Sequence, residues 1–411
     1  MYILYNMAIY IASFILQIIA FFNSKIGLFI NGRKNVFSDL EKNITEHDAT
    51  IWIHSASLGE FEQGLPIIEK LKSEYPSYKI VVSFFSPSGF EVIKNTSKAD
   101  IVTYLPLDTP RNARRFIKAL RPKIAIFVKY EIWPNMLNEL SNNSIPILLI
   151  SAIFKSNQIY FKWYGGLMRN ALQKFSHIFI QDGESKKLLS SIGLENTTIN
   201  GDTRFDRVSE LRQQDNSLKF MDRFKKNSPC FVMGSTWPTD EEILIDYINT
   251  SSHEMKYVIA PHEIKTKEIE RLRESIHKKT LLLSASSEND IGNAEILIID
   301  TIGLLTKIYS YADMAYVGGA FSKGLHNTLE PAVFGVPVII GPNFAGFKEA
   351  EDLVKLKGIF SIGDKVDFTK FADKLFLDID FRRSTGNINA SYISKNKGAS
   401  IQIMNHIRTL I

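Results

Sequence analysis

The sequence contains a single cysteine, Cys230, among its 411 residues, so no disulfide can form within the chain. This fits a reducing compartment. The chain also lacks a dominant run of lysine and arginine, because its formal net charge is only +5 and the basic residues are spread along its length. A nucleic-acid partner is therefore not indicated, although a weakly basic surface can favour anionic substrates or an anionic membrane.

Metal and nucleotide-triphosphate signatures are missing as well. No group of histidine, cysteine and carboxylate residues has zinc-ligand spacing, and no Gly-x-x-x-x-Gly-Lys-[Ser/Thr] motif occurs. His54, Ser55 and Ser57 lie close together, but no Gly-x-Ser-x-Gly elbow surrounds them. We expect neither a metal ion nor another cofactor.

The N-terminus is free of charge over residues 1–23 and rich in isoleucine, phenylalanine, leucine and tyrosine. A helix of this length would span roughly 34 Å, enough for the core of a bilayer. A cleaved signal peptide is disfavoured, because no basic segment or small-residue cleavage site precedes Lys25. Lys25, Arg33 and Lys34 follow the apolar run, which places the remainder in the cytoplasm. We expect a membrane anchor over residues 1–24, with a helix lying in the interface as the alternative.

From about residue 50, short β-rich runs alternate with amphipathic stretches, which predicts parallel sheets covered on both faces. The strands predicted are 50–54, 78–85, 101–104, 123–128, 145–151 and 177–181, then 230–234, 256–260, 280–284, 295–299, 314–318 and 336–341. The fold class expected is α/β, with two Rossmann-like, doubly wound domains facing a cleft. The boundaries expected are an N-terminal domain over 25–207, a linker over 208–228, a C-terminal domain over 229–390 and a closing helix over 391–411.

Residues 318–330 form the segment with the clearest chemistry. A predicted strand ends at Gly318 and Gly319, where the backbone can approach a ligand because side chains are absent. A helix is predicted to begin near Asn327 or Thr328, and its free N–H groups suit a phosphate. Glu330 is placed to accept hydrogen bonds from sugar hydroxyls. The alternative is that Asn327 only caps the helix and Glu330 complements its dipole.

Two further loops follow predicted strands at the same edge of the second sheet. Residues 300–303 follow one strand, and Pro261 and His262 follow another. Ligands of doubly wound sheets bind at the carboxyl ends of the strands, which makes these loops site candidates. His262 taken alone is more typical of a structural histidine.

In the first half, Gly59 and Glu60 lie where a strand turns into a helix through Ser55-Ala56-Ser57. Glu60 could act there as a general base on an acceptor hydroxyl. Ser57-x-x-Glu60 is equally a capping box, and the pattern leaves both roles open. Glu131 follows the strand predicted over 123–128 and is a further candidate, although a structural turn around Trp133 fits the pattern at least as well.

Taken together, these motifs resemble the 3-deoxy-D-manno-octulosonic acid (Kdo) transferases, the lipid A glycosyltransferases of Gram-negative bacteria. The segments that carry the resemblance are 52–60, 104–108, 131–135, 200–206, 234–236, 300–303 and 326–332, besides the N-terminal anchor. The resemblance covers nearly the whole chain and implies the GT-B fold. It also implies an inverting, metal-independent enzyme that moves Kdo from CMP-Kdo to the lipid A precursor at the cytoplasmic face of the inner membrane.

By the same resemblance, Glu60 is the base that deprotonates the acceptor hydroxyl. Residues expected to contact the CMP of the donor are Pro261, His262, Ile302, Gly303, Leu304, Asn327, Thr328, Leu329 and Glu330. Further residues expected near the site are Gly59, Glu131, Gly318, Gly319 and His326. The chain departs from the family at Pro261-His262-Glu263, where the family often has Pro-Arg-His, so an expected arginine contact to phosphate is missing or supplied elsewhere. It departs again at Leu304, where glutamate is common.

Two other enzyme classes fit parts of the pattern. Another GT-B enzyme could use a UDP-sugar on a lipid carrier, and a nucleotide-sugar 2-epimerase would share the architecture. The anchor argues against the epimerase, since a soluble sugar nucleotide needs no membrane tether. A membrane-tethered binding protein without activity fits less well, because each half places a carboxylate in a loop expected to face the cleft. The sequence gives no prediction of oligomeric state or of the number of sugars transferred.

Overall fold

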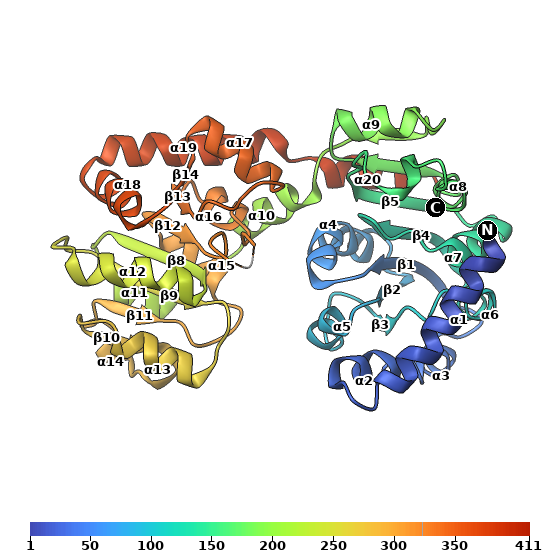
Figure 1. The fold of residues 1–411 in the computed structure, drawn as a ribbon, viewed down its shortest axis with the longest axis horizontal. Helices are drawn as coiled ribbons and strands as arrows, with labels where there is room; N and C mark the ends of the chain where they lie inside the picture. Colours follow the sequence, from blue (N-terminus) through green and yellow to red (C-terminus); the bar gives the residue numbers. More distant parts are fainter. Residues whose placement is uncertain (323) are drawn as a thin grey trace. The chain divides into compact units, whose positions relative to one another are not determined.

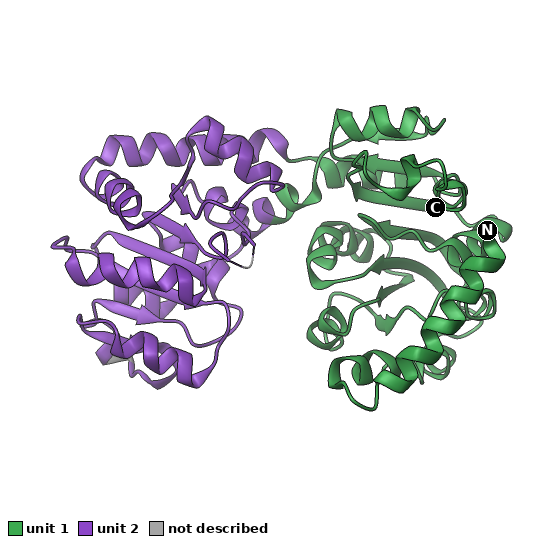
Figure 2. Cartoon of the chain, in the orientation of Figure 1, with its two compact units in different colours: residues 1–207, 397–411 green, residues 208–396 purple. Residues whose placement is uncertain are grey.

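The computed structural model describes residues 1–322 and 324–411. The chain divides into two compact units (Figure 2). Unit 1 comprises Met1–Arg207 and Lys397–Ile411, and unit 2 comprises Val208–Asn396. Each unit contains a seven-stranded sheet in which all paired strands are parallel, with helices on both faces (Figure 1). The predicted α/β class with two doubly wound domains is confirmed.

Unit 1 has the strand order β3-β2-β1-β4-β5-β6-β7. Its strands are β1 (Ala49–Ser55), β2 (Tyr78–Phe84), β3 (Ile101–Tyr104), β4 (Pro122–Val128), β5 (Ile147–Ala152), β6 (His177–Ile180) and β7 (Thr197–Ile199). Its helices are α1 (Tyr2–Ile19), α2 (Ser24–Asn31), α3 (Val36–Asn43), α4 (Leu58–Glu74), α5 (Pro87–Ile93), α6 (Pro110–Leu120), α7 (Pro134–Asn142), η1 (Ile159–Phe161), α8 (Gly166–Leu172), α9 (Gly183–Ser190) and α20 (Ala399–Ile407).

Unit 2 has the strand order β10-β11-β9-β8-β12-β13-β14. Its strands are β8 (Cys230–Thr236), β9 (Lys256–Pro261), β10 (Thr280–Leu282), β11 (Ile296–Ile298), β12 (Met314–Val317), β13 (Val338–Ile340) and β14 (Ile359–Ser361). Its helices are α11 (Lys219–Lys225), α12 (Pro238–Thr250), α13 (Thr266–Glu274), η2 (Leu283–Ala285), α14 (Glu288–Ile291), α15 (Leu305–Ile308), η3 (Tyr309–Tyr311), α16 (Leu329–Val333), α17 (Lys348–Leu356), α18 (Lys365–Leu377) and α19 (Ile379–Asn396).

Strand β1 shows why its sequence is apolar on both sides. Trp52 packs into the hydrophobic layer on one face of the sheet, while Ile51 and Ile53 pack into the layer on the other face. Successive side chains of a strand point to opposite faces, so a central strand of a parallel sheet buries all of them. Helix α6 shows how the sequence marks the start of a helix that covers the sheet. Thr109 caps it by accepting a hydrogen bond from the Asn112 N–H, and Pro110 occupies its first turn.

Two predicted boundaries differ from the structure. Residues 208–228, predicted as a linker, contain the end of α10 (Thr203–Gln213) and all of α11. Residues 391–411, predicted as one closing helix, are divided between the end of α19 and the separate helix α20, which belongs to unit 1. Asp206 accepts from the N–H groups of Gly398 and Ser400, and this contact fixes the start of α20. The polar composition of residues 208–228 suggested a linker. The segment is polar because these helices are short and bury only one face.

Candidate functional site

In unit 1, the candidate residues gather where β1 and β4 lie side by side at the centre of the sheet. The chain leaves β1 through Ser55–Ser57 into α4 and leaves β4 through 129–133 into α7. Because the strands are parallel, both loops lie at the carboxyl edge, at the point where the strand order reverses. Glu60 and Glu131 are thus brought to the same edge from sequence positions 71 residues apart.

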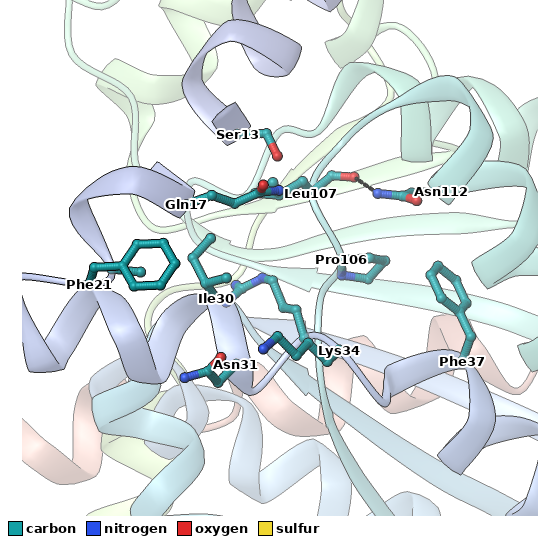
Figure 3. A pocket seen from close by; sticks show the side chains of 12 residues that line it. Ser13, Gln17, Phe21, Ile30, Asn31, Lys34, Phe37, Pro106, Leu107 and Asn112 are labelled. Atoms are coloured by element: carbon teal, nitrogen blue, oxygen red, sulfur yellow. Dashed lines mark hydrogen bonds between the residues drawn. The ribbon is translucent and has the colours of Figure 1, made fainter. Parts of the chain in front are cut away.

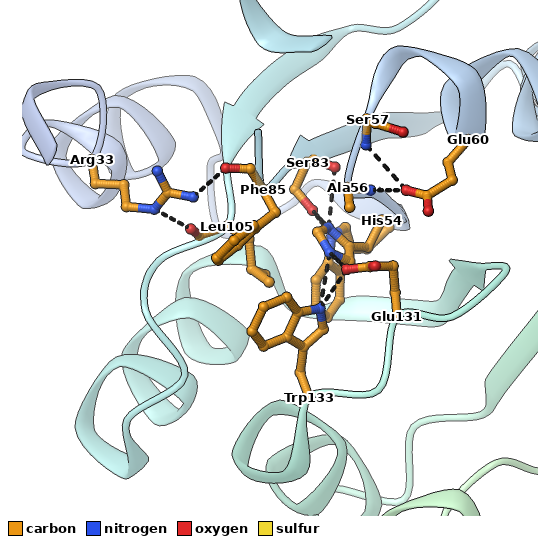
Figure 4. A network of polar contacts seen from close by, with 11 residues as sticks. Arg33, His54, Ala56, Ser57, Glu60, Ser83, Phe85, Leu105, Glu131 and Trp133 are labelled. Atoms are coloured by element: carbon orange, nitrogen blue, oxygen red, sulfur yellow. Dashed lines mark hydrogen bonds and ion pairs between the residues drawn. The ribbon is translucent and has the colours of Figure 1, made fainter. Parts of the chain in front are cut away.

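Glu60 lies in the first turn of α4 and is half-buried. One of its oxygens accepts from the Ala56 N–H at 2.6 Å and from the Ser57 N–H at 3.1 Å (Figure 4). Burial raises the pKa of Glu60 above its usual value, and the nearby charge of Glu131 raises it further, although the two N–H groups and His54 oppose this. The helix-capping contact is therefore present, and it leaves the second carboxylate oxygen available; the role as a base stays a prediction.

A buried polar network holds Glu131 in place (Figure 4). His54 is fully buried, and its Nε2 lies 3.0 Å from Glu131 Oε2. Trp133 Nε1 donates to the same oxygen at 2.9 Å. On the other side of the ring, His54 Nδ1 lies 2.9 Å from Ser83 Oγ, which accepts from Trp52 Nε1. A proton on His54 Nε2 satisfies all of these groups, so this network fixes the Glu131 carboxylate beside Glu60.

Space remains around the start of α4. Gly59 is exposed, and a methyl group built on it would meet no atom within 4 Å outside its own neighbourhood. Ser55 Oγ is buried without a hydrogen-bond partner. The Tyr130 hydroxyl lies close enough for the charge of Glu60 to raise its pKa, after the larger effect of burial. Polar groups thus surround an open surface next to Glu60, which suits a hydroxylated ligand.

In unit 2, three aromatic side chains meet at the equivalent point of the sheet. They are Trp237 after β8, His262 after β9 and His326 after β12. The rings of His262 and His326 stack with centroids 4.3 Å apart, and the Trp237 and His262 centroids are 4.7 Å apart. Trp237 Nε1 donates to His326 Nε2 at 3.0 Å. Burial and the neighbouring His262 lower the pKa of His326 to about 4, so this ring is neutral at physiological pH.

Gly318 and Gly319 are needed by the protein's own backbone. A methyl group at Gly318 would lie 2.4 Å from the Ser235 carbonyl oxygen, and one at Gly319 would lie 2.3 Å from that of Gly324. Gly319 also has φ +96°, and its N–H donates to Asp240 Oδ2 at 3.0 Å. The sequence prediction explained these glycines by close approach of a ligand, but the chain itself occupies the space that their side chains would fill.

The segment 327–330 forms the start of α16, within one or two residues of the predicted position. Asn327 Oδ1 accepts from the Leu329 N–H at 3.1 Å, and Asn327 Nδ2 donates to Glu330 Oε1 at 3.1 Å. Thr306 donates to Glu330 Oε2 at 3.0 Å. Thr328 Oγ1 is buried without a hydrogen-bond partner. Helix α16 has only five residues, so its dipole is weak. Lys323, within the predicted segment 318–330, lies outside the described residues.

The remaining donor candidates lie on neighbouring loops. Ile302 is 92% exposed and Gly303 has φ +91°, in the loop that joins β11 to α15. Leu304 is half-buried as the N-cap of α15. Pro261 ends β9, and the N–H of His262 donates to the Thr236 carbonyl. These loops follow β9 and β11 and lie at the same carboxyl edge as His326 and α16.

Two pockets of unit 1 flank α1. One, of about 590 Å³, is mostly apolar and is lined by Leu16, Lys25, Ile26, Leu28, Phe29, Phe85, Ser86, Pro87, Ser88 and Glu91. The other, also of about 590 Å³, carries amide and basic groups, including Gln17, Asn31, Lys34 and Asn112 (Figure 3). Arg33 lies in this second pocket, where burial lowers its pKa to about 9, and it donates to the carbonyls of Phe29, Phe85 and Leu105.

His54, Trp237 and Asp240 were missed as site residues by the sequence prediction. Each lies at or just after the carboxyl end of a central strand, which is the signal that could have identified them. His54 and Asp240 are fully buried, and their roles depend on partners 77 and 79 residues away in the sequence.

This chain matches a protein-family model and several known proteins in sequence. Residues 31–207 match the family described as "3-Deoxy-D-manno-octulosonic-acid transferase (kdotransferase)". The chain is 27% identical over 382 residues to a 3-deoxy-D-manno-octulosonic acid transferase of Haemophilus influenzae, which covers 87% of this chain and 86% of the relative. A protein of the same description from Aquifex aeolicus is 28% identical over 356 residues, covering 84% and 92%.

A solved structure shows the same fold. UDP-GlcNAc 2-epimerase from Neisseria meningitidis, bound to UDP-GlcNAc, aligns with a TM-score of 0.62 over 88% of this chain and 100% of its own, at 15% identity. Identity at this level shows the architecture alone. The sequence relatives and the two doubly wound units agree with the resemblance drawn from the motifs. Over most of its length the chain is therefore similar to the 3-deoxy-D-manno-octulosonic acid transferases, and it is a glycosyltransferase with the GT-B fold.

Proposed function

We propose that this protein transfers Kdo from CMP-Kdo to the lipid A precursor, with inversion at the anomeric carbon and without a metal ion. The observation that carries the proposal is Glu60: a half-buried carboxylate with a raised pKa, held by two backbone N–H groups beside an open surface. A base needs this combination of fixed position and elevated proton affinity.

In the proposed reaction, Glu60 takes the proton of the acceptor's primary hydroxyl as that oxygen attacks the anomeric carbon of Kdo. The new C–O bond forms on the face opposite the leaving group, and the bond between Kdo and the CMP phosphate breaks. CMP leaves with the electron pair and the negative charge. The negative charge of Glu131 raises the pKa of Glu60. Glu60 therefore binds the proton more strongly than an isolated carboxylate would.

Unit 2 is proposed to bind CMP-Kdo. The stacked rings of Trp237, His262 and His326 offer a flat surface for the nucleoside. Thr328, whose buried hydroxyl has no partner, and the backbone at the start of α16 are proposed to meet the phosphate. Glu330, already oriented by Thr306 and Asn327, is proposed to accept from ribose hydroxyls.

The proposal that the reaction needs no metal ion rests on how the potential metal ligands are arranged. Among residues 1–322 and 324–411, no group of three or more His, Cys, Asp or Glu side chains is arranged to hold a metal ion. The sequence Asp378-Ile379-Asp380 has the Asp-x-Asp spacing, but Asp378 accepts from the Phe381 N–H at the start of α19 and serves as a helix cap.

Action at the cytoplasmic face of the inner membrane is proposed from the N-terminal helix. Within the described residues, α1 is the one helix long and apolar enough to cross a membrane. Helices of this kind also occur as signal sequences, so membrane association is a proposal that the lipid acceptor makes reasonable.

Calorimetric titration of the full-length protein with CMP and with UDP tests the donor class. We expect CMP to bind and UDP to bind at least tenfold more weakly. The variant Trp237→Leu should weaken CMP binding, while Tyr311→Phe, in the same unit, should leave it unchanged. Equal binding of UDP and CMP would favour a UDP-sugar enzyme. Turnover in the presence of EDTA should equal turnover without it; its loss would contradict metal independence.

A further inference from the structure

Helix α1 lies lengthwise against the rest of unit 1 (Figure 1). The half-buried positions along the helix are Tyr2, Tyr5, Asn6, Ile9, Ser13, Leu16 and Ala20, which recur every three or four residues and share one face. Tyr5, Asn6 and Ser13 are among the polar residues on this face. The side of the helix that is least suited to lipid is therefore the side that packs on the protein.

Hydrogen bonds fix this face to the interior of unit 1. The Tyr5 hydroxyl donates to Asp108 Oδ2 at 2.7 Å, and Asn135 Nδ2 donates to Asn6 Oδ1 at 2.8 Å. Asp108 is only 1% exposed and also accepts from the backbone N–H groups of Asn135 and Met136. The helix is thus joined to the loops that begin α6 and α7, and to a carboxylate in the core.

The opposite face of α1 is apolar and exposed. Its exposed side chains include Ile3, Leu4, Met7, Tyr10, Ile11, Phe14, Ile15, Ile18 and Ile19. The turn after the helix adds Phe21 and Phe22, which are 86% and 87% exposed. At the other end, Trp163 is 91% exposed in the loop before α8, and a methyl group on Gly166 in α8 would lie 3.0 Å from the Met1 Cε. An exposed tryptophan is typical of the membrane–water interface, where its amphipathic ring lies at the level of the headgroups.

The charged residues that follow α1 in the sequence are basic. The first 38 residues contain no Asp or Glu, whereas Lys25, Arg33 and Lys34 follow the helix directly. Arg111 and Arg114 are exposed in the first turns of α6, close to the Asp108 contact. Basic groups beside an apolar face favour an anionic lipid surface as the partner.

A spanning arrangement would lose these contacts. It would place Asn6, Ser13 and Gln17 in hydrocarbon, where unpaired polar groups are costly.

We propose that α1 lies flat in the membrane interface, docked along unit 1, and does not cross the bilayer. The partner is the anionic lipid surface itself: the outer face of α1, the Phe21–Phe22 turn and the Trp163 loop enter it together. This inference rests on the membrane association in the proposed function and is independent of which sugar is transferred.

Spin labels at three outward positions test the arrangement. Leu4→Cys, Ile11→Cys and Ile18→Cys lie seven residues apart on one face, and the native Cys230 is fully buried. The labelled full-length protein is reconstituted into vesicles of phosphatidylethanolamine and phosphatidylglycerol, and the depth of each label is measured by power-saturation EPR. A flat helix predicts equal depths. A spanning helix predicts position 11 about 10 Å deeper than the others, because seven residues rise that far.

Each outcome has a separate meaning. A maximum at position 11 would overturn the flat arrangement but keep the membrane association. Labels that all stay in water would overturn both the arrangement and that part of the proposed function. Cross-linking supplies the docking control: Asn6→Cys with Asn135→Cys should join through a short bifunctional thiol reagent in vesicles, and Met7→Cys with Asn135→Cys should not. Equal yields would contradict docking through this face.

Discussion

Glu60 combines a structural contact and a proposed chemical role in one side chain. One oxygen accepts the two N–H groups at the start of α4, which is the helix-capping role that its spacing from Ser57 predicts. Because that contact fixes the carboxylate while burial and Glu131 raise its pKa, capping favours the proposed role as a base. The two interpretations of the pattern are therefore compatible.

Replacing Glu60 by glutamine separates the roles. The glutamine oxygen can still accept from the Ala56 and Ser57 N–H groups, so Glu60→Gln should fold normally. It should lose about 10²–10⁴-fold in kcat, the usual contribution of a general base. Glu62→Gln, on the same helix but paired with Arg207, is the matched control and should keep its activity. Circular dichroism and steady-state kinetics measure the two effects; a fully active Glu60→Gln would leave only the capping role.

The pH dependence of kcat/KM should change when the negative charge of Glu131 is removed. Activity is expected to fall as the pH drops below the raised pKa of Glu60, because the protonated carboxyl cannot act as a base. Glu131→Gln removes a negative charge that raises this pKa, so the acid limb of the kcat/KM profile should move to lower pH. An unchanged or upward-shifted limb would show that Glu60 does not control it.

The same shift predicts an effect on stability. The pKa of Glu60 is higher in the folded than in the unfolded state, so the folded protein holds this proton more tightly. The free energy of unfolding should therefore decrease as the pH rises from the ordinary value through the raised one. Glu60→Gln lacks this loss and should be more stable than the wild type at neutral pH, measured by thermal unfolding.

At the scale of elements, the loop after β12 needs glycine at position 319, because the backbone there has a positive φ and passes close to the Gly324 carbonyl. Gly319→Ala should destabilise the protein by about 1–3 kcal/mol, because it puts a Cβ at positive φ against the Gly324 carbonyl. Gly59→Ala is the contrasting variant: it has open space in α4 and should gain about 0.5–1 kcal/mol. Thermal unfolding of both variants measures the difference, and equal midpoints would contradict this assignment.

Helix α20 completes the core of unit 1 although it lies at the far end of the chain. Ile403 is fully buried in the layer that contains α4, whereas Ile401 is exposed. Ile403→Ala should cost about 2–5 kcal/mol and Ile401→Ala less than about 0.5 kcal/mol. Chemical denaturation checks the pair; similar losses would indicate that α20 does not pack in this way in solution.

The sequence predicted most elements because their signals are local. Twelve predicted strands overlap observed ones, since each is an apolar run long enough to recognise. The strands β7 and β14, each at an edge of its sheet, were missed. The His54–Glu131 network and the hydrogen bonds of α1 could not be predicted, because they join residues that are distant in sequence. The apolar run of α1 concealed that its few polar residues share one face.

At the scale of the whole molecule, the two units share one architecture but carry different side chains at the carboxyl edges of their sheets. The central edge of unit 1 carries two neighbouring carboxylates, suited to accept a proton from an uncharged hydroxyl. The corresponding edge of unit 2 carries stacked rings, a neutral histidine and the start of a short helix. This division supports the proposal that unit 1 binds the acceptor and unit 2 binds the nucleotide donor.

Turnover of the full-length protein tests this central claim most directly. The purified protein is incubated in lipid or detergent with CMP-Kdo and the tetraacyl disaccharide precursor of lipid A, and the lipid is analysed by mass spectrometry. We predict a product heavier by one or more Kdo units, formed by the wild type and by Glu62→Gln but not by Glu60→Gln. An unmodified lipid with CMP-Kdo, or modification by a UDP-sugar instead, would contradict the account.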